Sequence, residues 1–264
     1  MKLRIGIFDS GIGGFTILNS LLKTRSDLEV FYLADTKRVP YGNKNSLLIR
    51  SIAIEICNWF KDKNLDAILI ACNTTNSCAL DVIEEYLKIP CFDLINSVSE
   101  KITKKHVGVL ATPTTVKSLF YKKTIESKIK NVKVFQQECP ELVSEIEKIP
   151  LDLKKIDYLA HLYLNELLKQ NIEELILGCS HYPLICNAIK NKMHSKIKII
   201  DPSVALVQNF NNYFPNTWND CSDCISYDSV SFCVTANSED FSTKVKNWFE
   251  INKEIRLVNL RSND

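Results

Sequence analysis

The sequence has no long apolar run and no leader-like segment at its start. No run approaches the ~18 consecutive apolar residues that a membrane-spanning helix needs. The first apolar stretch, Leu3–Phe8, is short and is not followed by a cleavage site, so we expect a β-strand there and not a signal peptide. These two absences predict a cytoplasmic protein that makes no contact with a membrane.

The chain also lacks an excess of charge of either sign. Its 264 residues include 33 basic and 31 acidic side chains, which give a formal net charge of +2. A nucleic-acid-binding domain is usually marked by strong, clustered positive charge. The few lysine clusters here are expected to be solvated surface, because acidic residues are interspersed elsewhere. We therefore expect no nucleic-acid partner.

Two familiar phosphate-binding motifs are missing as well. The glycine-rich segment Asp9–Gly14 follows the first expected strand and opens a helix, but no Gly-Lys-Ser/Thr follows it. A dinucleotide fingerprint would need glycine where Thr16 stands. Three interpretations remain: a phosphate site, a plain tight turn, or a site for a small carboxylate ligand with Asp9 and Ser10 pointing into it. We favour the third.

Ten cysteines are present, but their scatter does not indicate a disulfide framework. Many lie inside apolar runs, where a reduced thiol packs as a small hydrophobic group. Cys221 and Cys224 have CxxC spacing, yet no second pair lies nearby, so zinc or redox chemistry there is only weakly indicated. We predict no metal site.

What the sequence does contain is a regular alternation of short apolar runs and helical patterns. Expected strands are 3–9, 30–34, 67–71, 107–111, 132–136, 174–178, 197–201 and 230–235. Expected helices are 15–23, 46–63, 78–87, 115–128, 140–147, 156–170, 182–193, 204–213 and 241–249. Such alternation is typical of βαβ units and of a mostly parallel sheet covered on both faces. In that architecture ligands bind beyond the carboxyl ends of the strands.

Two cysteines lie at such strand ends. Cys72 follows the strand at 67–71, and Cys179 follows the strand at 174–178. Each is expected at the start of a helix, where the helix dipole favours thiolate. His181, two residues after Cys179, is either a base or proton partner of that thiol or an ordinary polar residue, and we favour the former. The pair predicts a site with one sulfur on each of two walls.

Two further segments carry polar groups with simple alternative explanations. Val39–Gly42 is a loop turn, for which a structural role is the default. Thr112–Thr115 supplies hydroxyl and N–H groups at the end of another expected strand, and an ordinary helix N-cap would explain it as well.

The matching contexts of the two cysteines predict two similar α/β halves. The first half comprises residues 1–96 plus 205–264 and carries Asp9 and Cys72. The second comprises residues 97–204 and carries Glu147, Cys179 and His181. The C-terminal tail is expected to return to the first half.

Taken together, the motifs resemble one known family. They are Asp9–Gly14, Ala34–Thr36, Val39–Gly42, Ala71–Thr74, Gly108–Thr112 with Thr115, Cys139-Pro140 followed by Ile146-Glu147, and Gly178–Pro183. They occur in the order and spacing of the glutamate racemase family, the cofactor-independent enzymes of the aspartate/glutamate racemase superfamily. The resemblance spans nearly the whole chain. It differs mildly at Ser180, where threonine is commoner, and at Thr75, where a small residue is usual.

The resemblance implies two parallel-sheet α/β domains with the active site in the cleft between them. It also implies reversible interconversion of L- and D-glutamate, without a cofactor, to supply peptidoglycan synthesis. It makes Cys72 and Cys179 the two acid/base residues, with Asp9 beside Cys72 and with Glu147 and His181 beside Cys179. The substrate-binding positions that it implies are Asp9, Ser10, Tyr41, Gly42, Asn73, Thr74, Thr115, Ser180 and His181. The expected partner is therefore a small molecule, glutamate, and a homodimer is left open.

Three alternatives remain at this point. The chain could be another amino-acid racemase of the same superfamily, such as an aspartate racemase. It could be a binding protein that has kept the fold and acts on a protein partner such as a topoisomerase, although the presence of both cysteines argues against this. It could also be a thiol hydrolase with a Cys179–His181 nucleophile, which would leave Cys72 unexplained.

Overall fold

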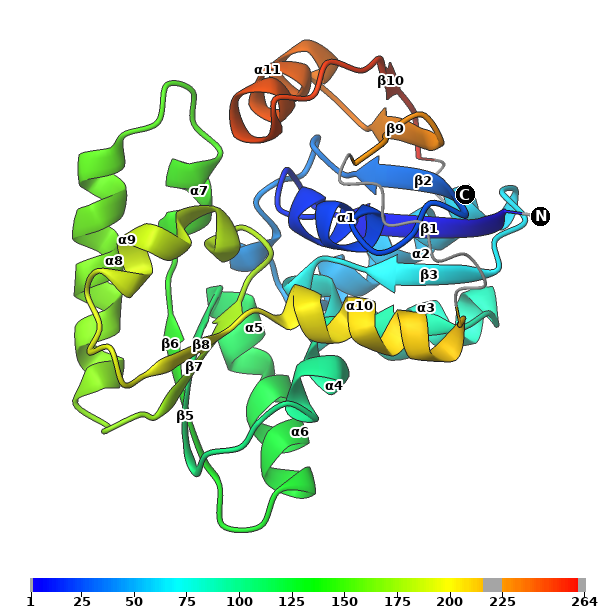
Figure 1. Ribbon diagram of the computed structural model, residues 1–264. Helices are drawn as coiled ribbons and strands as arrows, with labels where there is room; N and C mark the ends of the chain where they lie inside the picture. The colour runs from blue at the N-terminus through cyan, green and yellow to red at the C-terminus, as the bar shows by residue number, and fades with distance from the viewer. Residues whose placement is uncertain (1, 216–224, 261–264) are drawn as a thin grey trace.

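The computed structural model describes residues 2–215 and 225–260, and its strands form two parallel sheets. The first sheet has the order β10-β9-β2-β1-β3-β4, and the second has the order β6-β5-β7-β8. Figure 1 shows the sheets as the centres of two adjoining lobes. This confirms the predicted fold class of two parallel α/β units. The Cys221–Cys224 pair lies outside the described residues.

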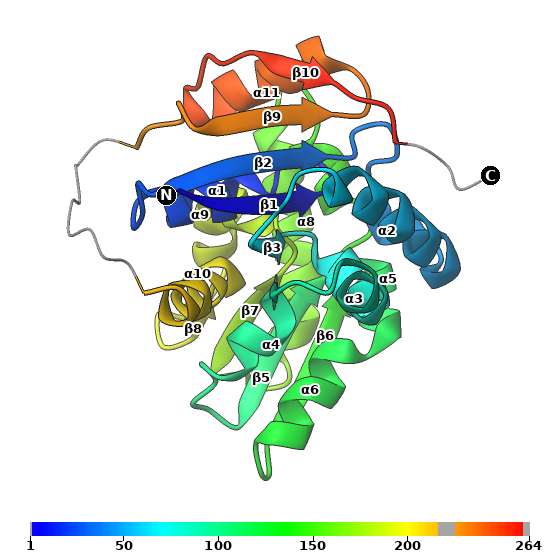
Figure 2. The same cartoon turned by 90° about the vertical axis from the view of Figure 1, so that its right-hand side faces the viewer.

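The strands are short, as apolar runs of this length predict. In the first sheet they are β1 (Leu3–Asp9), β2 (Leu28–Ala34), β3 (Ala67–Ile70), β4 (Cys91–Asp93), β9 (Val230–Val234) and β10 (Ile255–Leu257). In the second sheet they are β5 (His106–Ala111), β6 (Lys133–Glu138), β7 (Glu174–Gly178) and β8 (Lys198–Ile200). The tail does return to the first half, because β9 pairs with β2 (Figure 2).

Helices cover both faces of each sheet. Those following the first-half strands are α1 (Phe15–Leu22), the 3₁₀ turn η1 (Tyr41–Asn43), α2 (Ser46–Lys61), α3 (Asn73–Leu87), α4 (Leu94–Ser99), α10 (Pro202–Tyr213) and α11 (Ser238–Phe249). Those of the second half are α5 (Pro113–Ser118), α6 (Phe120–Lys128), α7 (Leu142–Ile146), α8 (Leu153–Leu168), η2 (Tyr182–Ile185) and α9 (Cys186–Lys190). No helix within 2–215 and 225–260 is long and apolar enough to span a membrane.

Alternating side chains along the strands build a core on each side of each sheet. In β1, Ile5 and Ile7 pack against α1, α10 and α11, whereas Phe8 packs against α2 and α3. In β7, Leu175 points into the core under α7 and α8, and Ile176 points to the opposite face. Each such buried side chain contributes about 1.5–3 kcal/mol to folding. The sheets are therefore fixed in place, and so are the loops at their carboxyl ends.

The chain passes between the halves through two helices that contact each other, α4 and α10. Ile95 and Val98 of α4 share a core cluster with Ala205 of α10. The predicted boundaries at 96/97 and 204/205 fall within these two helices. The division into domains at those residues stays a prediction.

Several element boundaries differ from the sequence-based expectation. Helix α3 begins at Asn73 and not near residue 78, because Cys72 has extended backbone angles and its carbonyl already accepts the amide of Asn76. The expected helix at 115–128 is divided at Leu119, whose φ of 60° breaks the helical path. The expected helix at 182–193 is a 3₁₀ turn followed by the short α9. The strands β4 and β10 were not expected, since three residues carry too little periodicity.

Candidate active site

The carboxyl ends of strands from both sheets meet at one place. Asp9 ends β1, Cys72 follows β3, and Cys179 follows β7. All three are buried, with exposed fractions of 0%, 3% and 5% respectively. The Ser180 hydroxyl donates a hydrogen bond of 3.0 Å to Asp9 Oδ1, which joins the Cys179 side directly to the Cys72 side.

The glycine-rich turn after β1 uses its backbone amides on carboxylates of the chain itself. Gly11 and Gly14 donate to Asp9 Oδ2 at 3.0 and 3.1 Å. Ile12 donates to Oε1 of Glu147 at 3.1 Å, across the contact between the halves. These three amides are therefore occupied without a bound anion, which speaks against the phosphate interpretation. The turn instead fixes Asp9 and the neighbouring Ser10.

Glycine at position 13 permits this close approach. A Cβ atom there would lie 2.4 Å from Ser180 Oγ and 2.7 Å from the Ser180 carbonyl carbon. Neither contact is tolerable, and backbone does not yield easily. Gly42 is in a similar position on the other side of the site, where a Cβ would lie 2.5 Å from Thr112 Cβ. The first half thus offers a glycine at each of the two places where Ser180 and Thr112 of the second half come close.

Cys72 is the N-cap of α3, as predicted, but its surroundings do not favour thiolate. Burial, and secondarily the charge of Asp9, raise the pKa of Cys72 to about 12. Its Sγ lies 3.8 Å from Ser10 Oγ. The dipole at the start of α3 favours thiolate, as expected, but burial and the Asp9 charge act in the opposite direction and outweigh it.

Cys179 has a different setting, since η2 begins three residues later and is a 3₁₀ turn. Its Sγ lies 3.8 Å from Nδ1 of His181, and Nε2 of His181 lies 2.7 Å from Oε1 of Glu147. Burial acts to lower the pKa of His181, but bonding to Cys179 and to Glu147 raises it well above 6.5. Burial acts to raise the pKa of Glu147, but His181 and Lys244 lower it to about 2. The surroundings thus favour imidazolium and carboxylate as the charged pair.

Three threonine hydroxyls form a closed triangle at the contact between the halves. Oγ1 of Thr112 lies 3.0 Å from Oγ1 of both Thr74 and Thr115, and Thr115 Oγ1 lies 3.4 Å from Thr74 Oγ1. Beside it, the Tyr121 hydroxyl donates to Asn73 Oδ1 at 2.6 Å. This bond orients the Asn73 amide so that its NH₂ group is left to donate elsewhere.

Tyr41 is buried next to this group, but its hydroxyl has its own partner. It donates to Asp35, a carboxylate that also accepts Thr235 Oγ1 at 2.6 Å and Arg38 Nε at 2.6 Å. The Tyr41 ring and the adjoining Gly42 are therefore held rigidly against the Cys72 side. A ligand would meet this segment through the ring and the backbone.

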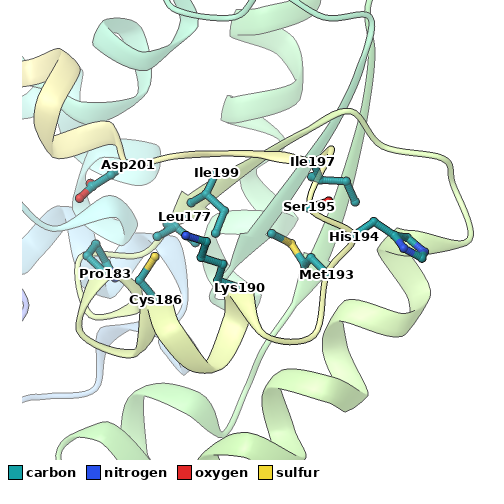
Figure 3. A pocket seen from close by; sticks show the side chains of 10 residues that line it. All are labelled: Leu177, Pro183, Cys186, Lys190, Met193, His194, Ser195, Ile197, Ile199 and Asp201. Carbon is teal, nitrogen blue, oxygen red and sulfur yellow. The ribbon is translucent and has the colours of Figure 1, made fainter.

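Two hollows lie near this group of residues. A cleft of about 650 Å³ runs between the start of α2 and the end of β6, with Lys44, Thr114 and Pro140 among its lining residues. A second pocket, of about 460 Å³, lies behind the Cys179 segment and is lined by Leu177, Pro183 and Cys186, with Asp201 and His194 at opposite ends (Figure 3). The lining of neither includes a residue of the predicted site, which is itself buried. Among the described residues, no group of three His, Cys, Asp or Glu side chains is arranged to hold a metal.

The structure brings the predicted site residues together and adds some that the sequence did not point to. From the sequence, Thr112 stands out only as part of a strand-end segment. Tyr121 and Lys244 had no signal at all, because each lies in an ordinary amphipathic helix and reaches its partner only through tertiary folding. The eight cysteines that the structure describes are all free thiols, as expected.

Comparisons with known proteins agree with this architecture. The family model for Asp/Glu/Hydantoin racemase matches residues 18–210. A protein of Prochlorococcus marinus named glutamate racemase is 44% identical over 259 residues, which is 98% of both chains. The crystal structure of glutamate racemase from Francisella tularensis in complex with D-glutamate is 32% identical, with a TM-score of 0.88 and 99% of both chains covered. That of a Bacillus anthracis glutamate racemase isoform is 26% identical, with a TM-score of 0.88 and 98% of both chains covered. The chain belongs to the Asp/Glu/Hydantoin racemase family.

Proposed function

We propose that this protein interconverts L-glutamate and D-glutamate, without a cofactor, and so supplies D-glutamate for peptidoglycan synthesis. The observation that carries the proposal is the convergence of two buried cysteines from opposite halves, joined by the bond from Ser180 to Asp9. Membership of the racemase family, with relatives named glutamate racemase over 98% of their length, supports glutamate as the substrate.

Racemisation needs a proton to leave Cα from one face and another to arrive on the opposite face. A single base would have to reach both faces, whereas two thiols on opposite walls divide the task. One removes the proton as thiolate while the other donates as thiol, so this is general acid–base catalysis without a covalent intermediate. We assign Cys179 to L-glutamate and Cys72 to D-glutamate as the proton acceptor, following the family resemblance.

The proposed base must be deprotonated in the substrate complex. With its pKa at about 12, Cys72 is a thiol at neutral pH. The α-ammonium of glutamate would bring positive charge beside Asp9 and Cys72, and a nearby positive charge favours thiolate. We therefore assign Asp9 to handling the ammonium group and protons on the Cys72 side. His181 and Glu147 have the corresponding task at Cys179, where Sγ is 3.8 Å from His181 Nδ1.

The substrate's carboxylates need donors, and the site is rich in them. The proposed binding residues are Ser10, Tyr41, Gly42, Asn73, Thr74, Thr115, Ser180 and His181, together with Asp9. A well-placed donor to charge that develops on the α-carboxylate is worth about 3–4 kcal/mol in the transition state. Such donors stabilise the carbanion in the absence of a pyridoxal ring.

The decisive experiment follows L-glutamate in D₂O with purified protein and no added cofactor. Deuterium should enter the α position, as seen by NMR, and circular dichroism should fall to zero. Strict dependence on added pyridoxal phosphate or metal would refute the cofactor-independent mechanism. Aspartate and a hydantoin are assayed side by side, and preference for either over glutamate would overturn the substrate assignment.

The remaining expectations belong with this proposal. The activity implies a cytoplasmic enzyme with a small-molecule partner, and a homodimer stays a prediction. We also propose that residues 1–96 plus 205–264 and residues 97–204 are the two domains that open to admit substrate. A pure binding protein is disfavoured, because it would have no need for Ser10 and His181 beside two buried thiols.

A further inference from the structure

The side chain of Lys244, on the C-terminal helix α11, reaches Glu147 on the Cys179 side of the site. Lys244 Nζ lies 3.0 Å from Oε2 of Glu147 and 2.8 Å from Oδ2 of Asp240. Its side chain is only 12% exposed, and burial of an ammonium group is costly unless it is paired. Figure 1 shows α11 above the first lobe, at the side where α7 lies. The ion pair therefore links α11, in the C-terminal part of the first half, to the residue of the second half that holds His181.

Glu147 depends on such outside support. It is the C-cap of α7, a helix of only five residues, so local backbone gives its side chain little hold. Its Oε1 meets Nε2 of His181 at 2.7 Å and accepts the Ile12 amide at 3.1 Å. Its Oε2 meets Lys244. Both carboxylate oxygens are therefore fixed, by donors from three separate parts of the chain.

We propose that Lys244 is a positioning residue for the racemase reaction: it holds the Glu147 carboxylate against His181 and thereby sets the proton handling of Cys179. This inference rests on the proposed function. The ion pairs of Lys244 are with Glu147 and Asp240, so we expect its effect on Cys179 to pass through Glu147. Without it, the carboxylate would keep a buried negative charge with one oxygen unpaired, and it would turn towards solvent.

The first test is kinetic and compares Lys244→Met with Lys246→Met, an exposed lysine of the same helix with no part in the site. Lys244→Met should lower kcat/KM on the order of tenfold, the usual scale for loss of a charged hydrogen bond. The loss must be equal in both directions, since enantiomers have an equilibrium constant of one. In Lys244→Met, the primary deuterium isotope effect should rise with L-glutamate as the substrate, because Cys179 takes the proton in that direction. It should not rise with D-glutamate as the substrate. Lys246→Met should match the wild type, and Lys244→Arg should recover much of the loss.

A double-mutant cycle tests whether the effect passes through Glu147. In a Glu147→Gln background, Lys244→Met should cause little further loss. A full additional loss there, or wild-type kinetics in Lys244→Met alone, would overturn the proposal. If Lys244→Met does not fold by circular dichroism, Lys244→Gln takes its place in the same cycle.

The second test needs no activity and so separates this inference from the proposed function. The Ile12 amide is protected by Glu147 Oε1, and its hydrogen exchange reports where that carboxylate lies. Exchange at Ile12 should be faster in Lys244→Met and in Glu147→Gln, and unchanged in Lys246→Met. Unchanged exchange in Lys244→Met would refute the positioning role. If exchange at Ile12 is faster in Lys244→Met but the wild-type protein does not racemise glutamate, the proposed function is refuted and the positioning role of Lys244 stands.

Discussion

At the scale of single residues, the two cysteines are similar in sequence context and different in chemistry. Cys72 is deeply buried beside Asp9, and burial raises its pKa to about 12. Cys179 is followed by His181, whose ring is in turn held by Glu147. The two thiols therefore have different neighbours, a carboxylate beside Cys72 and an imidazole–carboxylate pair beside Cys179.

Replacing either cysteine by serine should abolish racemisation while leaving the fold intact. Serine keeps the size of the side chain, but its hydroxyl has a pKa far too high to serve as the base. We expect a fall in kcat of about a thousandfold or more for both Cys72→Ser and Cys179→Ser, within the range for loss of a general base. Polarimetric turnover of each glutamate enantiomer measures this, with far-UV circular dichroism as the folding control. Near-wild-type turnover in either variant would remove that cysteine from the mechanism.

The Glu147–His181 pair should make stability depend on acid pH. Burial opposes ionisation of Glu147, yet the His181 and Lys244 charges lower its pKa from 4.5 to about 2. A lowered carboxylate pKa stabilises the folded state above pH 4.5, and that contribution, about 3 kcal/mol, is lost as pH falls towards 2. Urea unfolding of wild type and Glu147→Gln should therefore differ most above pH 5 and converge near pH 2. A difference that stays constant from pH 7 to pH 3 would contradict this assignment.

At the scale of elements, the start of α3 is the most heavily supported turn of the site. Asn76 Nδ2 donates to the carbonyls of Ile70 and Cys72, both at 2.8 Å, and its Oδ1 accepts the Leu94 amide at 2.6 Å. One buried side chain thus ties β3, the Cys72 position and α4 together. The apolar pattern of α3 begins only near residue 78, although the helix starts at Asn73, because its first turn is polar and buried.

Asn76→Ala should loosen this turn. Three hydrogen bonds are lost and buried backbone groups are left unpaired, so we expect a destabilisation of about 2–4 kcal/mol. Turnover should fall in both directions, because the turn that carries Cys72 loses its side-chain ties to β3 and α4. Urea unfolding and kcat measure the two effects. Ser127→Ala, which removes an exposed hydroxyl bonded only within its own helix, is the control and should stay within about 0.5 kcal/mol of wild type.

At the scale of the whole molecule, the site exists only while the two halves are in contact. Ser180 reaches Asp9, Thr112 reaches Thr74, and Lys244 reaches Glu147 across the same boundary. Each is a hydrogen bond or ion pair that separation would break. These three links are polar, which suits the opening of the two halves proposed above.

Tyr121→Phe should weaken that contact at one point. The Tyr121 hydroxyl from α6 is the partner of Asn73 Oδ1 at the start of α3, and Tyr121 is fully buried. Its loss frees the Asn73 amide to turn, so we expect KM for glutamate to rise about tenfold, with a smaller effect on kcat. Initial-rate kinetics measure the split. A purely structural role for the hydroxyl would instead lower the unfolding free energy, by about 1–3 kcal/mol, and leave KM unchanged.

What the sequence determined by itself was local. Apolar runs such as 3–9 and 174–178 were identified at their observed bounds, and the strand ends after them located Asp9, Cys72 and Cys179. Those inferences succeed because strand burial and strand ends depend on neighbouring residues. The family resemblance then implied roles for residues as distant in sequence from Cys72 as Glu147 and His181.

Tertiary structure alone decided how these pieces act on one another. Burial raised the Cys72 pKa against the expectation from its helix position, since desolvation depends on everything packed around the thiol. The partners Tyr121 of Asn73 and Lys244 of Glu147 lie 48 and 97 residues from the groups they hold. No periodicity or spacing in the sequence indicates such a pair, because the side chains meet only after the two sheets and the C-terminal elements β9 and α11 have packed together.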